Sequence, residues 1–307
     1  VLWDARPLVG ERVLVIGATG HLGGKAVDAL LARGHQVRAL VRASSDTTPL
    51  KTKPVELVRG DLLDPGSLDR ALAGTDALVT TANGFFRRQK GESPASVDLQ
   101  GQLALAEAAK RVGIKRFVLT SVLNCDKAVD VPHFYAKKVV EDRLTQLGVP
   151  FVALRPGSFI DQREDRWAGA LKKGSFQAIG NPARAITHVP TAEVARCLAL
   201  AVDHPEAEGK VIDIGCDRPL SARDIADLFG RILNRPVKVQ AAPWAVVGTI
   251  MGGVGLFNPM VKDLRAMLKF LTFGPYVADT SRQRALFGDV PRAEDALTTY
   301  AKAKGLV

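Results

Sequence analysis

Three glycines in the segment 17–23, Gly-Ala-Thr-Gly-His-Leu-Gly, separate an apolar run from a helical pattern. Residues 13–16 predict a buried strand, residues 24–33 a helix closed by Gly34, and residues 37–41 a second strand. Closely spaced glycines let the backbone approach a pyrophosphate, and free amides at the helix start can bind its oxygens. A similar turn without a ligand is the alternative. We predict a dinucleotide-binding βαβ unit with cofactor contacts at Gly17, Thr19, Gly20, His21, Leu22 and Gly23.

The end of the second strand bears on which dinucleotide binds. A site for NAD(H) places a carboxylate there to accept hydrogen bonds from the ribose hydroxyls. This chain has Arg42 instead, followed by Ser44 and Ser45, with Lys51 and Lys53 nearby. A guanidinium pairs a phosphate or stacks on adenine. The sequence therefore predicts NADP(H) as cofactor, held at its 2′-phosphate by Arg42 and Ser44; an ordinary exposed surface arginine is the alternative.

Strands and helices continue to alternate through the first half of the chain. Further strands are predicted at 55–58, 76–81, 115–120 and 151–154, and helices at 97–112 and 132–147. This order predicts an α/β fold with a Rossmann-type, doubly wound parallel sheet. The strand ends then share one edge, where Asp61 and Leu62 would meet the adenine and Thr81, Ala82 and Asn83 the nicotinamide ribose. A turn or helix cap is the alternative role for Asp61.

Beyond Arg155 the periodicity changes and indicates a second lobe. We predict an NADP-binding Rossmann domain at 10–157, with later strands of its sheet supplied by 158–215, and a smaller C-terminal substrate lobe at 158–307. Helix 191–202, strand 211–214 and a capping box that begins at Ser221 belong to this later part.

An uncharged run at 240–261 is long enough in principle to cross a bilayer. Pro243, several glycines and Asn258-Pro259 break it into short pieces, so we expect an apolar lid segment at 240–275 or packed helices. No membrane span is expected, and peripheral membrane contact stays open. A pocket between the lobes, lined by Ser158, Phe159, Trp244, Met251 and Phe257, favours a small, flat, apolar substrate.

Charge and cysteine content narrow the remaining classes. The 307 residues carry 42 Lys and Arg against 32 Asp and Glu, which favours anionic ligands. The tight basic cluster 87–90 lacks interleaved aromatics, so no nucleic-acid partner is expected. Three scattered cysteines fit neither a disulfide framework nor a metal site, and the first residues do not form a secretory signal. We expect a cytoplasmic protein without a bound metal.

These motifs together resemble the extended and atypical short-chain dehydrogenase/reductase superfamily, most closely its NmrA-like branch. The resemblance covers nearly the whole chain. It rests on the glycine-rich turn with Gly24, Gly60-Asp61-Leu62, Val97-Asp98 through Gly113-Ile114-Lys115-Arg116-Phe117-Val118, Lys137 with Glu141, and Leu154-Arg155-Pro156-Gly157.

The resemblance also implies catalytic positions. Lys137 would occupy the place of the family lysine that holds the nicotinamide ribose, Ser121 that of the serine that polarises a carbonyl, and Pro156 would border the cofactor. His133 stands where typical members carry a tyrosine, and an imidazole also suits proton transfer near neutral pH. Capping or packing is the alternative for His133, and a strand-end turn for Ser121. Tyr135 with Lys138 is a competing pair.

Two functions follow from the resemblance. The first is an NADPH-dependent reductase that transfers hydride to a small apolar carbonyl, enone or quinone. The second is an NADP(H)-binding redox sensor, or a regulatory or assembly protein, with little turnover and a protein partner; the absent tyrosine favours it. A nucleotide-sugar epimerase or dehydratase fits less well, because such enzymes rely on that tyrosine. The oligomeric state is not indicated.

Overall fold

The computed structural model describes residues 10–85, 92–161 and 164–307, so the basic cluster 87–90 lies outside the described part. The chain divides into two compact units. The first comprises the residues up to Ser121 with Ala136–Leu154 and Val194–Val211, and the second comprises Val122–Tyr135, Arg155–Glu193 and Ile212–Val307.

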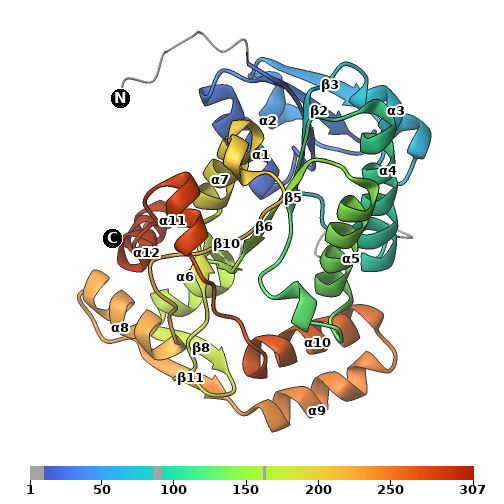
Figure 1. Cartoon of the computed structure of the whole chain (residues 1–307). Coiled ribbons are helices and arrows are strands. Elements are labelled where there is room, and N and C mark those ends of the chain that lie inside the picture. Colours follow the sequence, from blue (N-terminus) through green and yellow to red (C-terminus); the bar gives the residue numbers. More distant parts are fainter. Residues whose placement is uncertain (1–9, 86–91, 162–163) are drawn as a thin grey trace. The chain divides into compact units, whose positions relative to one another are not determined.

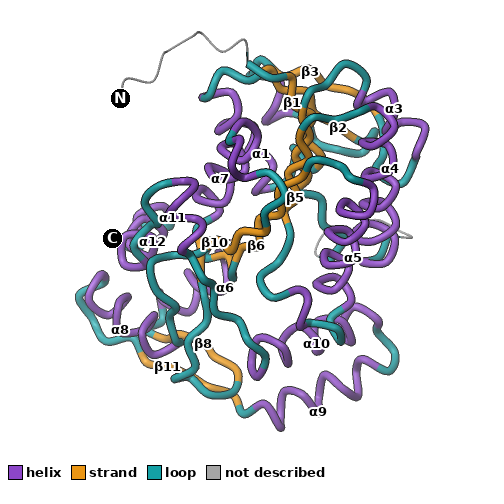
Figure 2. The backbone as a smooth tube through the Cα atoms, in the orientation of Figure 1, coloured by secondary structure: helices purple, strands orange, loops and turns teal. Residues whose placement is uncertain are grey.

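A seven-stranded sheet has the strand order β10-β6-β5-β4-β1-β2-β3. Figure 2 shows strands in orange and helices in purple. The pairings from β3 through β6 are parallel, which confirms the predicted fold class. The chain reverses direction across the sheet between β1 and β4, where such folds bind ligands at the carboxyl ends of the strands. The strands are β1 (Arg12–Ile16), β2 (Gln36–Val41), β3 (Val55–Arg59), β4 (Ala77–Thr80), β5 (Arg116–Thr120), β6 (Phe151–Pro156) and β10 (Val211–Ile214).

Helices cover both faces of the sheet within the first unit. Figure 1 shows α3, α4 and α5 on one face and α1 and α7 on the other. On the first face Leu14 and Ile16 of β1 pack in one cluster with Leu68, Leu105 and Leu144. Alternate residues of a strand point to opposite faces, so a strand covered on both sides is apolar throughout. The helices are α1 (His21–Ala32), α2 (Thr48–Lys51), α3 (Pro65–Leu72), α4 (Gln102–Val112), α5 (Pro132–Leu147) and α7 (Thr191–Asp203).

The helix predicted at 97–112 differs at its start. A π-helical segment, η1 (Ala95–Gly101), precedes α4 and contains Asp98, whose side chain is fully buried. Hydrogen bonds in a π-helix span one residue more than in an α-helix, which changes which side chains face inward, a feature that apolar periodicity does not reveal. The strand and helix predicted at 211–214 and 132–147 have the observed bounds.

The second unit has its own small sheets and core. Strands β7 (Ser158–Phe159) and β9 (His188–Val189) pair in parallel, as do β8 (Ser175–Ile179) and β11 (Lys238–Ala242). Trp167, Phe176, Phe229 and Tyr300 form edge-to-face ring contacts in the core. Both bonds of the capping box at Ser221 are present. The helices are α6 (Glu164–Lys172), α8 (Ala222–Ile232), α9 (Trp244–Gly255), α10 (Pro259–Phe273), α11 (Ser281–Phe287) and α12 (Ala293–Ala303).

The uncharged run at 240–261 forms the end of β11, the whole of α9 and the start of α10. Asn258 caps α10, since its side-chain oxygen accepts hydrogen bonds from the amides of Met260 and Val261. Among the described residues, no helix combines the length and hydropathy that crossing a membrane requires.

Candidate functional site

The glycine-rich turn has a geometry that only glycine tolerates at two positions. Gly17 has a φ of +85°, in the region that side chains disfavour. A Cβ atom at Gly23 would lie 2.0 Å from the carbonyl oxygen of Gly17, so α1 approaches the turn more closely than any side chain allows. Gly20 precedes α1 and has no side chain to cap its first amides. This turn therefore fits the pyrophosphate of a dinucleotide, which such amides bind.

The loop after β4 lies against this turn. Register places Ile16 beside Thr80, and the Thr81 hydroxyl donates to the carbonyl of Ile16 at 3.1 Å. Thr81 thereby links the loop after β4 to the start of the glycine-rich turn. Asn83 is exposed, and its side-chain oxygen accepts a hydrogen bond from the amide of Phe85.

Lys137 of α5 lies behind this loop in a buried ion pair. Its Nζ is 3.2 Å from Oδ1 of Asp98 and 3.4 Å from the carbonyl oxygen of Ala82. The side chains of Lys137 and Asp98 are 4% and 0% exposed. Asp98 Oδ2 also accepts a hydrogen bond from the amide of Gly84. The pair therefore fixes a cation directly beneath the predicted ribose loop.

A second buried contact joins Ser121, at the end of β5, to Glu141 of α5. The Ser121 hydroxyl donates to Glu141 Oε1 at 2.6 Å, and both residues are buried. This bond fixes the orientation of the hydroxyl. Asp98 and Glu141 were not among the predicted site residues, although the spacing of Lys137 and Glu141, four residues apart, was a signal that they share a face of α5.

His133 lies in the first turn of α5, one turn before Lys137, and belongs to the second unit, as does Pro156 at the end of β6. His133 is 3% exposed and contacts the ring of Phe134 edge to face. The competing pair differs in burial: Tyr135 is exposed, and Lys138 pairs with Asp142 at the surface. Burial thus distinguishes Lys137 from Lys138.

Arg42 lies at the end of β2, as predicted, and forms an ion pair with Glu92. The Arg42 side chain is 35% exposed, whereas the Glu92 side chain is 8% exposed. Ser44 is exposed beside it, and the Ser45 hydroxyl accepts a hydrogen bond from the Arg42 amide. A phosphate bound at Arg42 would therefore share this guanidinium with the Glu92 carboxylate. Glu92 was not among the predicted site residues.

Asp61 and Leu62 follow β3 at the same edge of the sheet. The Asp61 carboxylate accepts a hydrogen bond from the amide of Leu63, and the Ser67 hydroxyl binds the Asp61 amide and carbonyl. These are the contacts of a turn-forming residue, which is the alternative role predicted for Asp61. Leu62 is buried. Thr19, His21 and Leu22 follow β1 at this same edge of the sheet.

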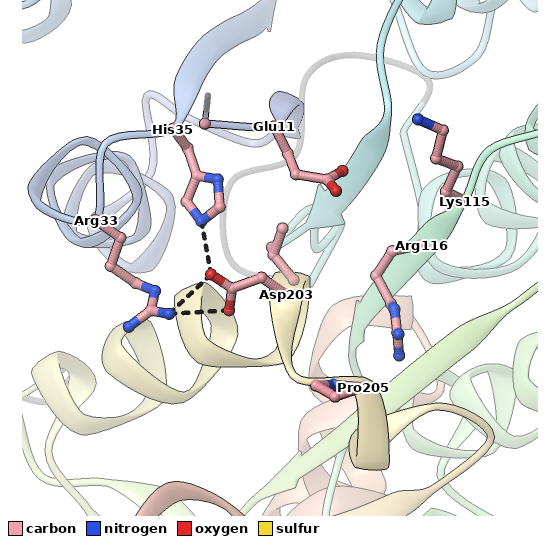
Figure 3. Close-up of a pocket in the computed structure, with 9 residues that line it drawn as sticks. Glu11, Arg33, His35, Lys115, Arg116, Asp203 and Pro205 are labelled. Atoms are coloured by element: carbon pink, nitrogen blue, oxygen red, sulfur yellow. Dashed lines mark hydrogen bonds and ion pairs between the residues drawn. The ribbon is translucent and has the colours of Figure 1, made fainter. Parts of the chain in front are cut away.

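A pocket of about 300 Å³ lies at the opposite edge of the sheet, in the first unit (Figure 3). It is lined by residues at or near the amino ends of strands, among them Glu11, His35 and Arg116, and by the end of α7. The Arg33 guanidinium donates to both carboxylate oxygens of Asp203, at 2.9 and 2.8 Å, and His35 Nε2 is 3.5 Å from Oδ2. These contacts join the ends of α1 and α7.

We expect acid to weaken this connection. Burial raises the pKa of Asp203, but the contacts with His35 and Arg33 outweigh it, and the net pKa is below the ordinary value of 3.8. A lowered folded pKa stabilises the fold above the unfolded pKa, and this contribution is lost as the pH falls through the folded value. Asp203→Asn should lower the free energy of unfolding by about 1 to 2 kcal/mol at pH 7. Urea unfolding should show that the loss shrinks below about pH 4; an equal loss at pH 3 and 7 would contradict it.

The chain is similar in sequence to a family of known proteins. The model of the NmrA-like family matches residues 10–284. The photosystem II assembly factor Ycf39 of Cyanophora paradoxa is 31% identical over 236 residues, which cover 76% of this chain and 72% of that protein.

Solved structures share the fold at lower identity. Triphenylmethane reductase of Citrobacter sp., complexed with NADP(H), aligns with a TM-score of 0.79 at 19% identity, over 94% of this chain and 99% of that one. An NADPH-dependent quinone oxidoreductase of Escherichia coli, complexed with NADPH, aligns with a TM-score of 0.74 at 20% identity and the same coverage. Because the family match extends over most of the sequence, this chain belongs to the NmrA-like family.

Proposed function

We propose that this chain binds NADP(H) at the carboxyl edge of its sheet and transfers hydride to a small apolar carbonyl, enone or quinone. The observation that carries the proposal is the adjacency of the glycine-rich turn and the loop Thr81 to Asn83, with Lys137 buried behind that loop. Dinucleotide complexes of structural neighbours support a nicotinamide cofactor. The predicted domain at 10–157, with later strands from 158–215, and the substrate lobe at 158–307 belong to this proposal, as does a cytoplasmic location.

When bound, NADPH supplies the hydride. The protein would bind the pyrophosphate at the amides of the first turn of α1 and the 2′-phosphate at Arg42. Lys137 would hold the ribose, and Asp98 would act as a positioning residue through Lys137. An apolar acceptor that gains a hydride also needs a proton. His133 or solvent would provide it, while the Ser121 hydroxyl would need to turn from Glu141 to reach a carbonyl.

The test is NADPH oxidation, followed by absorbance, against a panel of quinones, enones and aldehydes, after calorimetry has measured NADPH binding. Turnover of an apolar acceptor supports the reductase. NADPH binding without turnover of any acceptor would contradict it and support the alternative, a sensor or assembly protein. Two observations favour this alternative. The chain is 31% identical to a photosystem II assembly factor, and it has a histidine at position 133.

His133→Phe tests the proton donor. We expect turnover to fall about 100-fold or more, with the loss of any pH dependence between pH 5 and 8, because a phenyl ring has no proton to exchange. The pH profile of kcat is the measurement, and His204→Phe, on the loop after α7, is the matched control. An unchanged profile would assign the proton to solvent.

The cofactor preference is set by opposing charges at the end of β2. Arg42→Ala should weaken NADPH binding about tenfold or more and leave NADH binding nearly unchanged. Glu92→Gln should have the opposite sign and strengthen NADPH binding, because it removes the carboxylate that shares the guanidinium. Calorimetry with both nucleotides measures the ratio. Arg70→Ala, an exposed arginine of α3, is the control, and equal losses for NADPH and NADH in Arg42→Ala would overturn the phosphate assignment.

A further inference from the structure

Helix α9 presents a face of large apolar side chains to solvent. Val246, Ile250 and Val254 repeat every four residues along it and are 54%, 63% and 49% exposed. Leu256 and Phe257, in the turn after α9, are 81% and 89% exposed, and Met260 follows at the start of α10. We call these six residues the apolar face. A contiguous set of this kind is unusual on the surface of a monomeric protein and marks an interaction site.

The opposite side of α9 combines glycines with the half-buried side chains of Trp244, Val247 and Met251. The Arg265 side chain donates to the carbonyl oxygen of Gly248 at 2.8 Å. A Cβ at Gly252 would lie 3.5 Å from Arg265 Nε, and one at Gly255 would lie 3.3 Å from the Cα of Lys262. Gly252 and Gly255 thus lie against α10, whose Arg265 also reaches the backbone at Gly248. Trp244 and Phe273 close the far end of the helix pair with an edge-to-face contact.

This arrangement reverses the usual pattern of an amphipathic helix in water. A helix on the surface of a water-soluble domain turns its large apolar residues inward. Helix pairs in contact with lipid place small residues between the helices and large apolar residues outside. Helix α9 has glycines at its contacts with α10 and large apolar residues exposed, as in the second pattern, although Trp244, Val247 and Met251 are half-buried. Burial within its own hairpin does not account for the six exposed side chains.

The charges around the apolar face indicate the kind of surface that it meets. Between Lys238 and Lys262 the chain has no charged residue. Lys262 follows Met260 by two positions, and Lys269 lies two turns further along α10; both are exposed. Asp263 is the one acidic residue of α10, against Lys262, Arg265 and Lys269. The whole chain carries a net charge of +10. Apolar side chains bordered by lysines are typical of segments that lie on anionic bilayers.

We propose that the hairpin of α9 and α10 docks on the surface of an anionic phospholipid bilayer. Leu256 and Phe257 enter the boundary between headgroups and acyl chains, and Lys262 and Lys269 meet the lipid phosphates. The hairpin does not span the bilayer, because the 12 residues of α9 extend about 18 Å against a hydrocarbon core of about 30 Å. This proposal is independent of hydride transfer.

The test is co-sedimentation of the full chain with vesicles of phosphatidylcholine alone or with about one-third phosphatidylglycerol. We expect binding to the anionic vesicles, weakened by salt. The double variant Leu256→Ser/Phe257→Ser should lose at least about tenfold in affinity, since both side chains leave water on docking. The double variant Lys262→Gln/Lys269→Gln should lose the preference for anionic lipid. Val129→Ser/Val277→Ser, which changes exposed valines elsewhere, is the matched control and should bind as the unchanged chain does.

A second measurement reports insertion directly. In Phe257→Trp, the emission should shift to shorter wavelength by more than in the unchanged chain, which has three tryptophans of its own, when anionic vesicles are added, and not with neutral ones. The proposal is overturned if the unchanged chain does not sediment with either vesicle, or if Leu256→Ser/Phe257→Ser binds like the control. It is also overturned if that variant changes a dimer into a monomer in vesicle-free solution without affecting sedimentation, because a second copy would then cover the apolar face.

Discussion

Lys137→Met should lower the free energy of unfolding by about 3 to 5 kcal/mol, because it leaves the carboxylate of Asp98 buried without its cation. NADPH-dependent turnover should be lost as well, since Lys137 is the proposed ribose ligand. Urea unfolding and the NADPH oxidation assay measure the two effects. Lys138→Met, one residue along α5 at a surface ion pair, should change the free energy of unfolding by less than about 1 kcal/mol.

A second variant separates stability from chemistry. Lys137→Met/Asp98→Asn removes both charges and should recover most of the lost stability, because no unpaired ion remains. Turnover should stay absent. If the double variant folds and retains turnover, Lys137 is a structural residue and its proposed role in the site is wrong. If the single variant is as stable as the unchanged chain, the ion pair contributes little.

Gly23→Ala should weaken NADPH binding at least about tenfold and lower the free energy of unfolding by about 1 to 3 kcal/mol. The added Cβ would lie 2.0 Å from the carbonyl oxygen of Gly17, so the first turn of α1 and the glycine-rich turn must move apart. The amides that would bind the pyrophosphate move with them. Calorimetry with NADPH and thermal unfolding are the measurements.

The neighbouring residue is the control for Gly23. A Cβ at Gly24 would lie 3.7 Å from the carbonyl oxygen of Ala18, an ordinary contact. Gly24→Ala should therefore keep NADPH binding and raise stability by up to about 1 kcal/mol, because alanine favours a helix over glycine. Equal effects of the two substitutions would mean that close packing at Gly23 does not shape the turn.

The two proposed functions differ in what Lys137 is for. A reductase needs Lys137 for the reaction and uses an apolar acceptor. A sensor or assembly protein needs only the bound nucleotide and a surface for its partner. Turnover that persists in Leu256→Ser and disappears in Lys137→Met would show that the two regions act separately.

Local sequence predicted the strands β1 to β6 and their parallel pairing, but not their order across the sheet. Apolar runs of four to six residues marked β1 to β6, and their alternation with helices predicted a parallel sheet. Glycines marked the turn after β1, since the constraint at Gly17 and Gly23 is a matter of backbone geometry close in sequence. The positions of Arg42 and Thr81 at the ends of strands followed from these predicted strands.

Three features depended on the tertiary structure. Asp98 meets Lys137, and Glu92 meets Arg42, because the sheet brings distant segments together, and a carboxylate's burial cannot be read from its neighbours in sequence. The sequence of 240–261 shows that this segment is uncharged, but not which of its side chains pack inside the protein and which are exposed. The packing of α10 decides that, because a helix can turn only one side to its partner: Gly252 and Gly255 lie against α10, Trp244, Val247 and Met251 are half-buried, and Val246, Ile250 and Val254 are left exposed.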